Sequence, residues 1–320
     1  MSYTVLIPQQ ITRPGEEYLE EKGYQIKRGS KADEQTMMEE AADCDAILIR
    51  AAKLTAKVMD AAPKLKIIAR HGVGVDNIDV GYAEKKGIWV TNAPLSNYNA
   101  VAEQAILLIL GCAKHSRIID LHFRADDYYI GHRVMSLELK GKTLGILGLG
   151  KIGTSLAKKA HLGFEMSVIG YDPYAKPENL PEYVELKGSM QEVLRRADFV
   201  SVHMPLTPET KKLIGLNEIK LMKPTAFLVN TARGGIIDEE ELVEALKQKV
   251  IAGGAFDFLE KDPPEITNPL FQFENVIITP HNAAITYEAM DRMGLHAAQG
   301  IHEVLSGKRP SWPVNQPFKK

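Results

Sequence analysis

Residues 143–172, TLGILGLGKIGTSLAKKAHLGFEMSVIGYD, constrain the fold more than any other part of this 320-residue chain. The short apolar run at 144–147 is typical of a strand that is buried on both faces. Gly148, Gly150 and Gly153 follow with the spacing G-x-G-x-x-G, and apolar residues then recur at helical spacing. A second buried strand, 166–171, ends at Asp172. A strand, a tight turn, a helix and a strand within about thirty residues form the unit that binds dinucleotides.

The residue types in this unit suit a dinucleotide. Gly148 permits the sharp turn, Gly150 lets a pyrophosphate approach the backbone, and Gly153 lets the helix pack closely on the sheet. The free N–H groups and the positive dipole end of the helix attract phosphates. Asp172, about 20 residues after Gly153, can accept hydrogen bonds from both ribose hydroxyls of NAD and would repel the extra phosphate of NADP. We therefore predict NAD as the cofactor, in preference to a turn whose glycines serve the backbone alone.

The composition excludes several other classes of protein. The chain has 39 basic and 41 acidic residues, a net charge of −2, and no basic run that would suggest nucleic acid. Its two cysteines, Cys44 and Cys112, form neither a disulfide framework nor a metal-ligand spacing. We therefore expect no metal, and a reducing compartment such as the cytoplasm. The longest apolar run, 105–113, is too short to span a bilayer, and the N-terminus carries no secretory signal.

Short apolar runs alternate with amphipathic segments along the chain, which predicts doubly wound parallel sheets. A long helix from 99 to about 120 is apolar almost all round, so we expect it to be buried between domains or subunits. The segments expected before this helix are strands 4–8, 24–27, 46–49, 66–69 and 89–91 and helices 14–22, 33–42, 56–61 and 80–86. The strands expected in the second part are 144–147, 166–171, 199–203, 226–230, 251–255 and 276–279.

A helical stretch from 285 to about 306 would return the chain to its first domain. We predict an α/β fold of two doubly wound parallel-sheet domains. A Rossmann NAD-binding domain is expected at 99–284. A flavodoxin-like substrate domain is expected from 1–98 together with 285–320. Ligands of open α/β sheets bind at the carboxyl ends of the strands, so the residues that follow the strands are the candidates for a site.

Three side chains after strands of the second domain suit an oxidoreductase. Arg233 can hold a carboxylate in a bidentate pair. His281 can donate or accept a proton near neutral pH. Asp262 can fix the tautomer of a histidine and favour its charged form. Taken singly, each is better explained as a surface arginine, part of a solvated turn or a strand-end histidine. The NAD motif in the same domain shifts the balance toward a site for all three.

Two features of the first domain are candidate anion contacts. The loop 70–77, RHGVGVDN, contains small residues and presents backbone N–H groups that an anion can approach. An ordinary glycine-rich turn explains this loop equally well. Arg50 follows another strand and is a surface arginine by default.

Together these residues resemble the D-isomer-specific 2-hydroxyacid dehydrogenases over nearly the whole chain. The matching segments are 71–79, 101–103, 148–153, 171–173, 203–207, 230–235, Asp257 and 279–281. The resemblance implies that Arg233 binds the substrate carboxylate and carbonyl and that His281 is the acid/base. It implies that the Val73 and Gly74 amides are the second clamp on the carboxylate. The resemblance also implies that Asp172 contacts the ribose and that Asp257 contacts the nicotinamide carboxamide. The other residues that it implies to contact the substrate or the cofactor are Lys151, Ile152, His203, Pro205, Thr231, Ala232, Arg233 and His281. The family also implies a site in the cleft between two domains and a homodimer joined through the NAD domains.

One position departs from the family pattern. The family usually has a glutamate before a proline, five positions after the residue that Asp257 matches, and this chain has Asp262 before Pro263. Glu260 lies two positions earlier and does not match. Aspartate keeps the charge but is one methylene shorter, so we expect it to pair with His281 less tightly.

The N-terminal third resembles phosphoglycerate dehydrogenase, with Arg50 and Lys53 where a substrate phosphate is held. We expect 3-phosphoglycerate dehydrogenase activity, and no C-terminal regulatory domain, because the chain ends soon after the returning helix. Reduction of glyoxylate, hydroxypyruvate or a branched 2-oxo acid is the alternative. A non-enzymatic NAD-sensing scaffold is a further alternative, because corepressor proteins share this fold. The presence of Arg233, Asp262 and His281 and the lack of long tails count against a scaffold.

Overall fold

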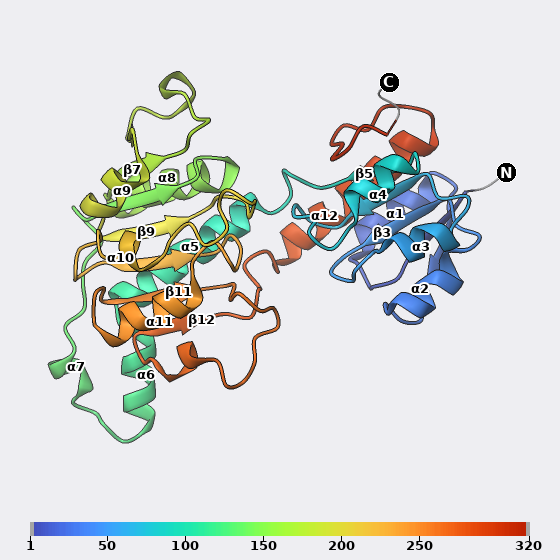
Figure 1. Ribbon diagram of the computed structural model, residues 1–320. Coiled ribbons are helices and arrows are strands. Elements are labelled where there is room, and N and C mark those ends of the chain that lie inside the picture. The colour runs from blue at the N-terminus through green and yellow to red at the C-terminus, as the bar shows by residue number, and fades with distance from the viewer. Residues whose placement is uncertain (1–2, 318–320) are drawn as a thin grey trace. The chain divides into compact units, whose positions relative to one another are not determined.

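The computed structural model describes residues 3–317, which form two compact units (Figure 1). Unit 1 comprises Met1–Asn97 and Ala284–Lys320, and unit 2 comprises Tyr98–Ala283. Residues 1–2 and 318–320, which were included in the predicted substrate domain, lie outside the described residues.

Unit 1 contains a five-stranded parallel sheet with the order β2-β1-β3-β4-β5, which is the flavodoxin-like order. Every residue of its central strand, Ala46–Ile49, is buried, because helices cover both faces of the sheet. The strands are β1 (Thr4–Ile7), β2 (Gln25–Arg28), β3 (Ala46–Ile49), β4 (Ile67–Arg70) and β5 (Trp89–Thr91). The helices are α1 (Arg13–Glu21), α2 (Glu34–Ala41), α3 (Ala56–Ala61), α4 (Val80–Lys85) and α12 (Tyr287–Leu305).

The C-terminal helix α12 belongs to unit 1 because it packs tightly on α1. A Cβ atom added at Gly15 would lie 2.8 Å from the backbone carbon of Gly294, so these helices approach closely where neither carries a side chain. Ala297, Ala298 and Ile301 of α12 are buried in one core cluster with residues of β1, β3 and β4. The chain segments before and after unit 2 therefore build one core.

Unit 2 contains a seven-stranded parallel sheet with the order β12-β11-β10-β9-β6-β7-β8. Within it lies the Rossmann order, with β12 added at one edge. The strands are β6 (Thr143–Leu147), β7 (Ser167–Tyr171), β8 (Val184–Leu186), β9 (Phe199–Val202), β10 (Phe227–Asn230), β11 (Gly253–Phe256) and β12 (Val276–Ile278). The α-helices are α5 (Tyr98–Ala113), α6 (Ser116–Arg124), α7 (Ile130–Arg133), α8 (Lys151–Phe164), α9 (Met190–Arg196), α10 (Leu216–Ile219) and α11 (Glu239–Lys247), with short 3₁₀ turns η1 (Pro177–Asn179) and η2 (Pro269–Gln272).

The core of unit 2 fixes the strands whose ends carry the candidate site. Phe199 of β9 and Phe227 of β10 stack with ring centroids 5.6 Å apart, and both are almost completely buried. Full burial of a side chain of this size contributes about 1.5–3 kcal/mol. The strand β8 was not predicted, and its short run has only Val184 buried, so it shows little of the apolar pattern of a central strand.

The prediction of one helix from 99 to about 120 was wrong. Helix α5 ends at Ala113 and α6 begins at Ser116. His115 has φ 49°, a left-handed conformation that interrupts the helix, and its N–H group bonds the Cys112 carbonyl. Most of α5 is buried as expected, although Leu107 is 59% exposed. No residue of α6 is buried within the described chain, and α6 and α7 extend away from the sheet of unit 2 (Figure 1).

Candidate active site

The glycine-rich loop between β6 and α8 leaves its backbone open to a ligand. Gly148 has φ +98°, and a Cβ atom there would lie 2.8 Å from the His203 backbone. A Cβ atom at Gly153 would collide with the Gly148 carbonyl oxygen, whereas one at Gly150 would meet no atom within 4 Å. Helix α8 begins at Lys151, and its first N–H groups, including those of Lys151 and Ile152, have no partners within the helix. An anion can therefore reach these N–H groups over Gly150.

Asp172 combines a structural contact with free hydrogen-bonding capacity. Its Oδ2 accepts a hydrogen bond from the Leu149 N–H group at 2.9 Å, and its Oδ1 accepts one from the Tyr174 N–H group at 2.8 Å. A carboxylate offers about four acceptor positions, so each oxygen keeps about one for another donor. Two ribose hydroxyls match this remaining capacity.

In unit 2, two buried side-chain atoms near the strand ends have no hydrogen-bond partner among the described residues. They are Oγ1 of Thr231 and Nδ1 of His203. The other ring nitrogen of His203 lies 2.8 Å from the Ser201 hydroxyl, and burial lowers the pKa of His203 to about 3, so this ring is neutral. Buried polar groups normally have partners, so the two atoms are available to a bound molecule. Together with the glycine loop and Asp172 they fit a dinucleotide. Pro205 follows on the exposed segment after His203, and Ala232 is half-buried next to Thr231.

Asn230, the last residue of β10, folds the arginine loop. Its side-chain oxygen accepts a hydrogen bond from the Ala232 N–H group, and its amide donates to the Arg233 carbonyl at 2.8 Å. The guanidinium of Arg233 lies over the ring of Phe258, 5.1 Å from its centroid. The ring of Phe258 also lies against His281, with centroids 3.9 Å apart. One aromatic side chain thus contacts both candidate catalytic residues.

His281 pairs with Asp262. Its Nδ1 lies 2.7 Å from Asp262 Oδ2, and both side chains are about half exposed. Because a carboxylate accepts hydrogen bonds, the neutral imidazole places its proton on Nδ1 and leaves Nε2 free to exchange a proton. The aspartate reaches the histidine at an ordinary hydrogen-bonding distance although it is one methylene shorter than the glutamate usual at this position. Glu260 instead donates its backbone N–H group to Glu239.

Asp257 fixes the backbone on both sides of His281. It is 1% exposed, and its carboxylate accepts hydrogen bonds from the Thr279 hydroxyl at 2.5 Å and from the N–H groups of Asn282 and Ala283 at 3.0 Å. Its carbonyl accepts the N–H group of His281, which has φ 51°. These bonds leave about one acceptor position on the Asp257 carboxylate, which a carboxamide could use. The predicted contact with the nicotinamide carboxamide stays a prediction.

In unit 1, the loop after β4 presents unpaired backbone donors. Among the described residues, the N–H groups of Val73 and Gly74 have no hydrogen-bond partner, whereas their carbonyls accept bonds from Asn92 and Arg70 at 2.7 and 2.9 Å. Arg70 also donates to the His71 carbonyl. The loop is therefore held from its carbonyl side with two amides available to an anion.

Arg50 and Lys53 differ in how they are held. The half-buried Arg50 donates to the Gln10 carbonyl at 2.7 Å, and Asn77 ties the carbonyls of Arg50 and Ala52 to the loop after β4. Lys53 is exposed. The positive charge of Arg50 reaches this loop, because it assists burial in lowering the pKa of His71 to about 4. Arg50 uses one guanidinium N–H group to bond the Gln10 carbonyl, so most of its guanidinium donors can bind another acceptor.

The sequence interpretation missed the roles of Phe258, Arg70 and Glu239. Phe258 directly follows a strand-end acid, and Arg70 opens the glycine-rich loop, so their positions were visible signals. Glu239 had no such signal, because it contacts a segment about 20 residues away in the sequence.

Comparison with known proteins places this geometry in a family. The model of the D-isomer specific 2-hydroxyacid dehydrogenase NAD-binding domain matches residues 106–283. The D-3-phosphoglycerate dehydrogenase of Methanocaldococcus jannaschii is 41% identical over 98% of this chain, and the chain spans 59% of that relative's length. The glyoxylate reductase of Thermococcus litoralis is 38% identical, over 99% of this chain and 98% of that protein. The solved NADPH-dependent glyoxylate/hydroxypyruvate reductase of Sinorhizobium meliloti superposes with a TM-score of 0.87 at 27% identity, covering 99% of both chains.

The chain belongs to the D-isomer specific 2-hydroxyacid dehydrogenase family. Its two parallel α/β sheets are those of this family, and NAD is the cofactor of its Rossmann domain. No helix in the described residues is long and apolar enough to cross a membrane.

Proposed function

We propose that this chain interconverts a D-2-hydroxy acid and its 2-oxo acid with the help of Arg233, His281 and Asp262. When bound, NADH would supply the hydride to C2 of the 2-oxo acid, and in the reverse direction NAD would accept the hydride from C2 of the hydroxy acid. In unit 2, Arg233 offers its guanidinium to the carboxylate and the carbonyl of the substrate. Within unit 1, the backbone N–H groups of Val73 and Gly74 are available to an anion such as a carboxylate.

In this proposal the protein residues manage charge and a proton. During reduction, negative charge grows on the carbonyl oxygen, and Arg233 stabilises that charge. His281 delivers a proton from Nε2 to the same oxygen, and in oxidation it removes the hydroxyl proton. Asp262 holds Nδ1 and stabilises the charged imidazolium before the proton leaves.

The 2.7 Å contact between His281 and Asp262 carries this proposal, together with the contacts that Phe258 makes with both His281 and Arg233. The test is loss of NADH absorbance with a panel of 2-oxo acids. Reduction of at least one 2-oxo acid is expected, and no turnover with any member of a broad panel would contradict the proposal.

For the substrate we propose 3-phosphoglycerate, with 3-phosphohydroxypyruvate in the reverse direction. Arg50 and Lys53 support it, because both follow β3 and offer cationic donors to a phosphate. Arg50→Ala is expected to raise KM for 3-phosphohydroxypyruvate by about 10- to 100-fold, since a charged hydrogen bond contributes about 1.5–3 kcal/mol. Its KM for glyoxylate is expected to change little.

Reduction of glyoxylate or hydroxypyruvate is the second candidate. The Gln10 carbonyl already accepts a hydrogen bond from Arg50, and the chain covers 98% of the T. litoralis glyoxylate reductase. Efficient reduction of glyoxylate without activity on 3-phosphohydroxypyruvate would select this candidate and exclude the first.

We also propose that two copies associate through α6 and α7. Large apolar side chains are exposed there: Leu121 (43%), Phe123 (56%), Tyr128 (71%) and Tyr129 (67%). The rings of Phe123, Tyr128 and Tyr129 are neighbours, with successive centroids 6.2 and 5.5 Å apart, and exposed apolar clusters of this kind mark interaction sites. The family resemblance indicates a homodimer through the NAD domains. Light scattering coupled to gel filtration is expected to give a dimer, and Phe123→Glu is expected to give a monomer. A monomeric unmutated protein at micromolar concentration would contradict the proposal.

A further inference from the structure

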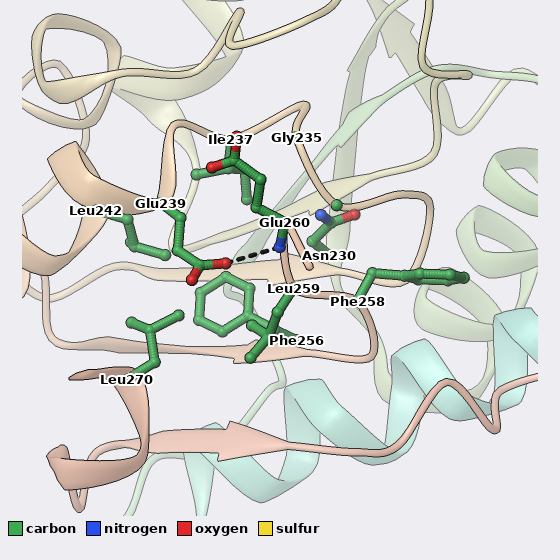
Figure 2. A pocket seen from close by; sticks show the side chains of 11 residues that line it. Asn230, Gly235, Ile237, Glu239, Leu242, Phe256, Phe258, Leu259, Glu260 and Leu270 are labelled. Carbon is green, nitrogen blue, oxygen red and sulfur yellow. Dashed lines mark hydrogen bonds between the residues drawn. The ribbon is translucent and has the colours of Figure 1, made fainter. Parts of the chain in front are cut away.

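The segment between β11 and η2 carries the acid of the His281–Asp262 pair, and two of its residues are hydrogen-bonded to one side chain of α11. It begins with Asp257 and Phe258, passes through Asp262 and ends at Asn268, which precedes η2. We call residues 257–268 the acid loop. Figure 2 shows where Glu239 of α11 meets this loop.

One carboxylate holds the acid loop on both sides of Asp262. Oε2 of Glu239 accepts the backbone N–H group of Glu260 at 2.7 Å, and Oε1 accepts the side-chain amide of Asn268 at 2.6 Å. The other side-chain atom of Asn268 accepts the Leu270 N–H group and caps η2. The two ends of the segment 260–268 are thus fixed to one side chain.

Glu239 is half-buried, and its bond to Asn268 is partly buried whereas its bond to Glu260 is exposed. Phe256, Leu242 and Leu270 line the small pocket beside it, whose volume is about 10 Å³ (Figure 2). This is about the space of one water molecule, so the pocket serves packing rather than substrate binding. Hydrogen bonds to a carboxylate are about twice as strong as neutral ones, and partial burial strengthens the bond to Asn268 further.

Glu239 itself is placed by α11. Asp238 caps this helix by accepting the Glu241 N–H group at 3.3 Å, so Glu239 occupies the first helical position. Negative charge is favourable at that end of a helix. Close to it, the arginine loop approaches the acid loop so tightly that a Cβ atom on Gly234 would collide with the Leu259 carbonyl oxygen. The position of the acid loop is therefore defined relative to both α11 and Arg233.

We propose that Glu239 is a positioning residue that keeps Asp262 against His281. This inference rests on the proposed function, because it concerns the proton transfer of His281. Without Glu239 the acid loop loses its attachments at Glu260 and Asn268, and the 2.7 Å contact between Asp262 and His281 is no longer enforced. The effect should then appear in the chemical step and its pH dependence, not in NADH binding.

Several charged groups lie near His281, and they influence how the reduction rate depends on pH. Asp262 bonds the ring directly, Arg233 lies on the neighbouring Phe258 ring, and Asp257 bonds the backbone of His281. Within the acid loop, Lys261 pairs with Glu265. Displacing Asp262 removes the negative charge that bonds the His281 ring and stabilises its protonated form, so the falling limb of the reduction rate should move to lower pH.

The test compares Glu239→Ala, Asp262→Asn and the double variant, with Glu240→Ala as the matched control. Glu240 is the next residue of α11 and is exposed, so its replacement changes the charge at this helix end without touching the acid loop. Asn268→Ala removes one of the two attachments and retains the Glu239 charge. kcat, its pH profile and the NADH dissociation constant are measured for each.

We expect Glu239→Ala to lower kcat about 10-fold, less than the ~10²-fold that a 1 Å misplacement can cost. The falling limb should move as it does in Asp262→Asn, with NADH affinity within about twofold of the unmutated protein. Adding Glu239→Ala to Asp262→Asn should cost less than about twofold more, because residues that act through one another are not additive. Asn268→Ala should shift the limb in the same direction.

Independent, additive losses in the double variant would overturn the inference, and so would an unmoved pH profile in both Glu239→Ala and Asn268→Ala. If Glu239→Ala does not fold, as judged by circular dichroism, Asn268→Ala decides alone. Failure of the unmutated protein to reduce any 2-oxo acid would contradict the proposed function and this inference with it. A different outcome would contradict only the inference. In that outcome the unmutated protein is active and Asp262→Asn shifts the falling limb of the pH profile, but Glu239→Ala and Asn268→Ala change neither kcat nor the profile.

Discussion

Replacing Asp172 by asparagine tests how the Rossmann domain distinguishes NADH from NADPH. The substitution removes the negative charge and keeps the size of the side chain. The remaining amide oxygen can accept one of the two backbone N–H groups, from Leu149 and Tyr174, that the carboxylate holds. The loop geometry is therefore better preserved than in Asp172→Ala, which leaves both donors without this partner.

The size of the effect follows from the two acceptor positions that Asp172 keeps for a ligand. Hydrogen bonds to a charged group contribute about 1.5–3 kcal/mol and neutral ones about 0.5–1.5 kcal/mol. Loss of about 1 kcal/mol at each of two ribose bonds should weaken NADH binding by about 30-fold. A unit charge about 4 Å from a 2′-phosphate charge, at an effective dielectric constant of about 20, costs about 4 kcal/mol. Its removal should strengthen NADPH binding by up to about 10³-fold.

Fluorescence titration of both cofactors measures the ratio of their dissociation constants. Glu178→Gln is the control, because Glu178 is an exposed acid of the same β7–β8 connection and its loss changes the net charge equally. The unmutated protein should prefer NADH, and Asp172→Asn should reduce this preference by at least about tenfold while the control retains it. An unchanged ratio in Asp172→Asn would show that this carboxylate does not select the cofactor.

Two further predictions concern stability and loop packing. Burial, with the charges of Arg50 and Arg70, lowers the pKa of His71 to about 4 from the usual 6.5. The unfolded chain therefore binds more protons between these values, and stability present above pH 6.5 is lost as the pH falls toward 4, by up to about 3 kcal/mol. The free energy of unfolding is measured at several pH values by urea unfolding followed by circular dichroism. It should fall less steeply with decreasing pH in His71→Gln than in the unmutated protein, and an identical slope in both proteins would contradict the prediction. Gly234→Ala should lower kcat by about 10²-fold with NADH binding retained, because its Cβ atom forces the arginine loop and the acid loop apart. Gly163→Ala, where a Cβ atom meets nothing within 4 Å, should leave kcat unchanged, and equal losses in both variants would contradict the steric argument.

Local patterns made much of the fold predictable. The glycine spacing before α8 and the acid after β7 lie within one supersecondary unit, so residue order alone fixes their geometry. Strands β3 and β5 occur where their apolar runs predict them, at Ala46–Ile49 and Trp89–Thr91. The break between α5 and α6 was missed because His115 adopts a left-handed conformation without the glycine that usually signals one.

Tertiary contacts account for what sequence could not predict in the candidate site. The residues Arg233, Asp262 and His281 became candidates only because their types and positions after strands occur in the same domain as the NAD motif. The packing of Phe258 against both Arg233 and His281 depends on how two loops fold over one sheet edge. Local sequence patterns do not reveal such a contact between separate loops. The same holds for Glu239, whose function as a loop attachment depends on the placement of α11.

The central claim is that His281 transfers the proton while NADH transfers the hydride, and kcat of His281→Ala in NADH-dependent 2-oxo acid reduction tests it most directly. Removing a proton donor typically costs about 10²–10⁴-fold in rate. The variant should lose kcat in this range, while its NADH dissociation constant, measured by fluorescence, stays within about twofold of the unmutated protein. A His281→Ala protein that retains near-normal kcat at saturating substrate would contradict the account.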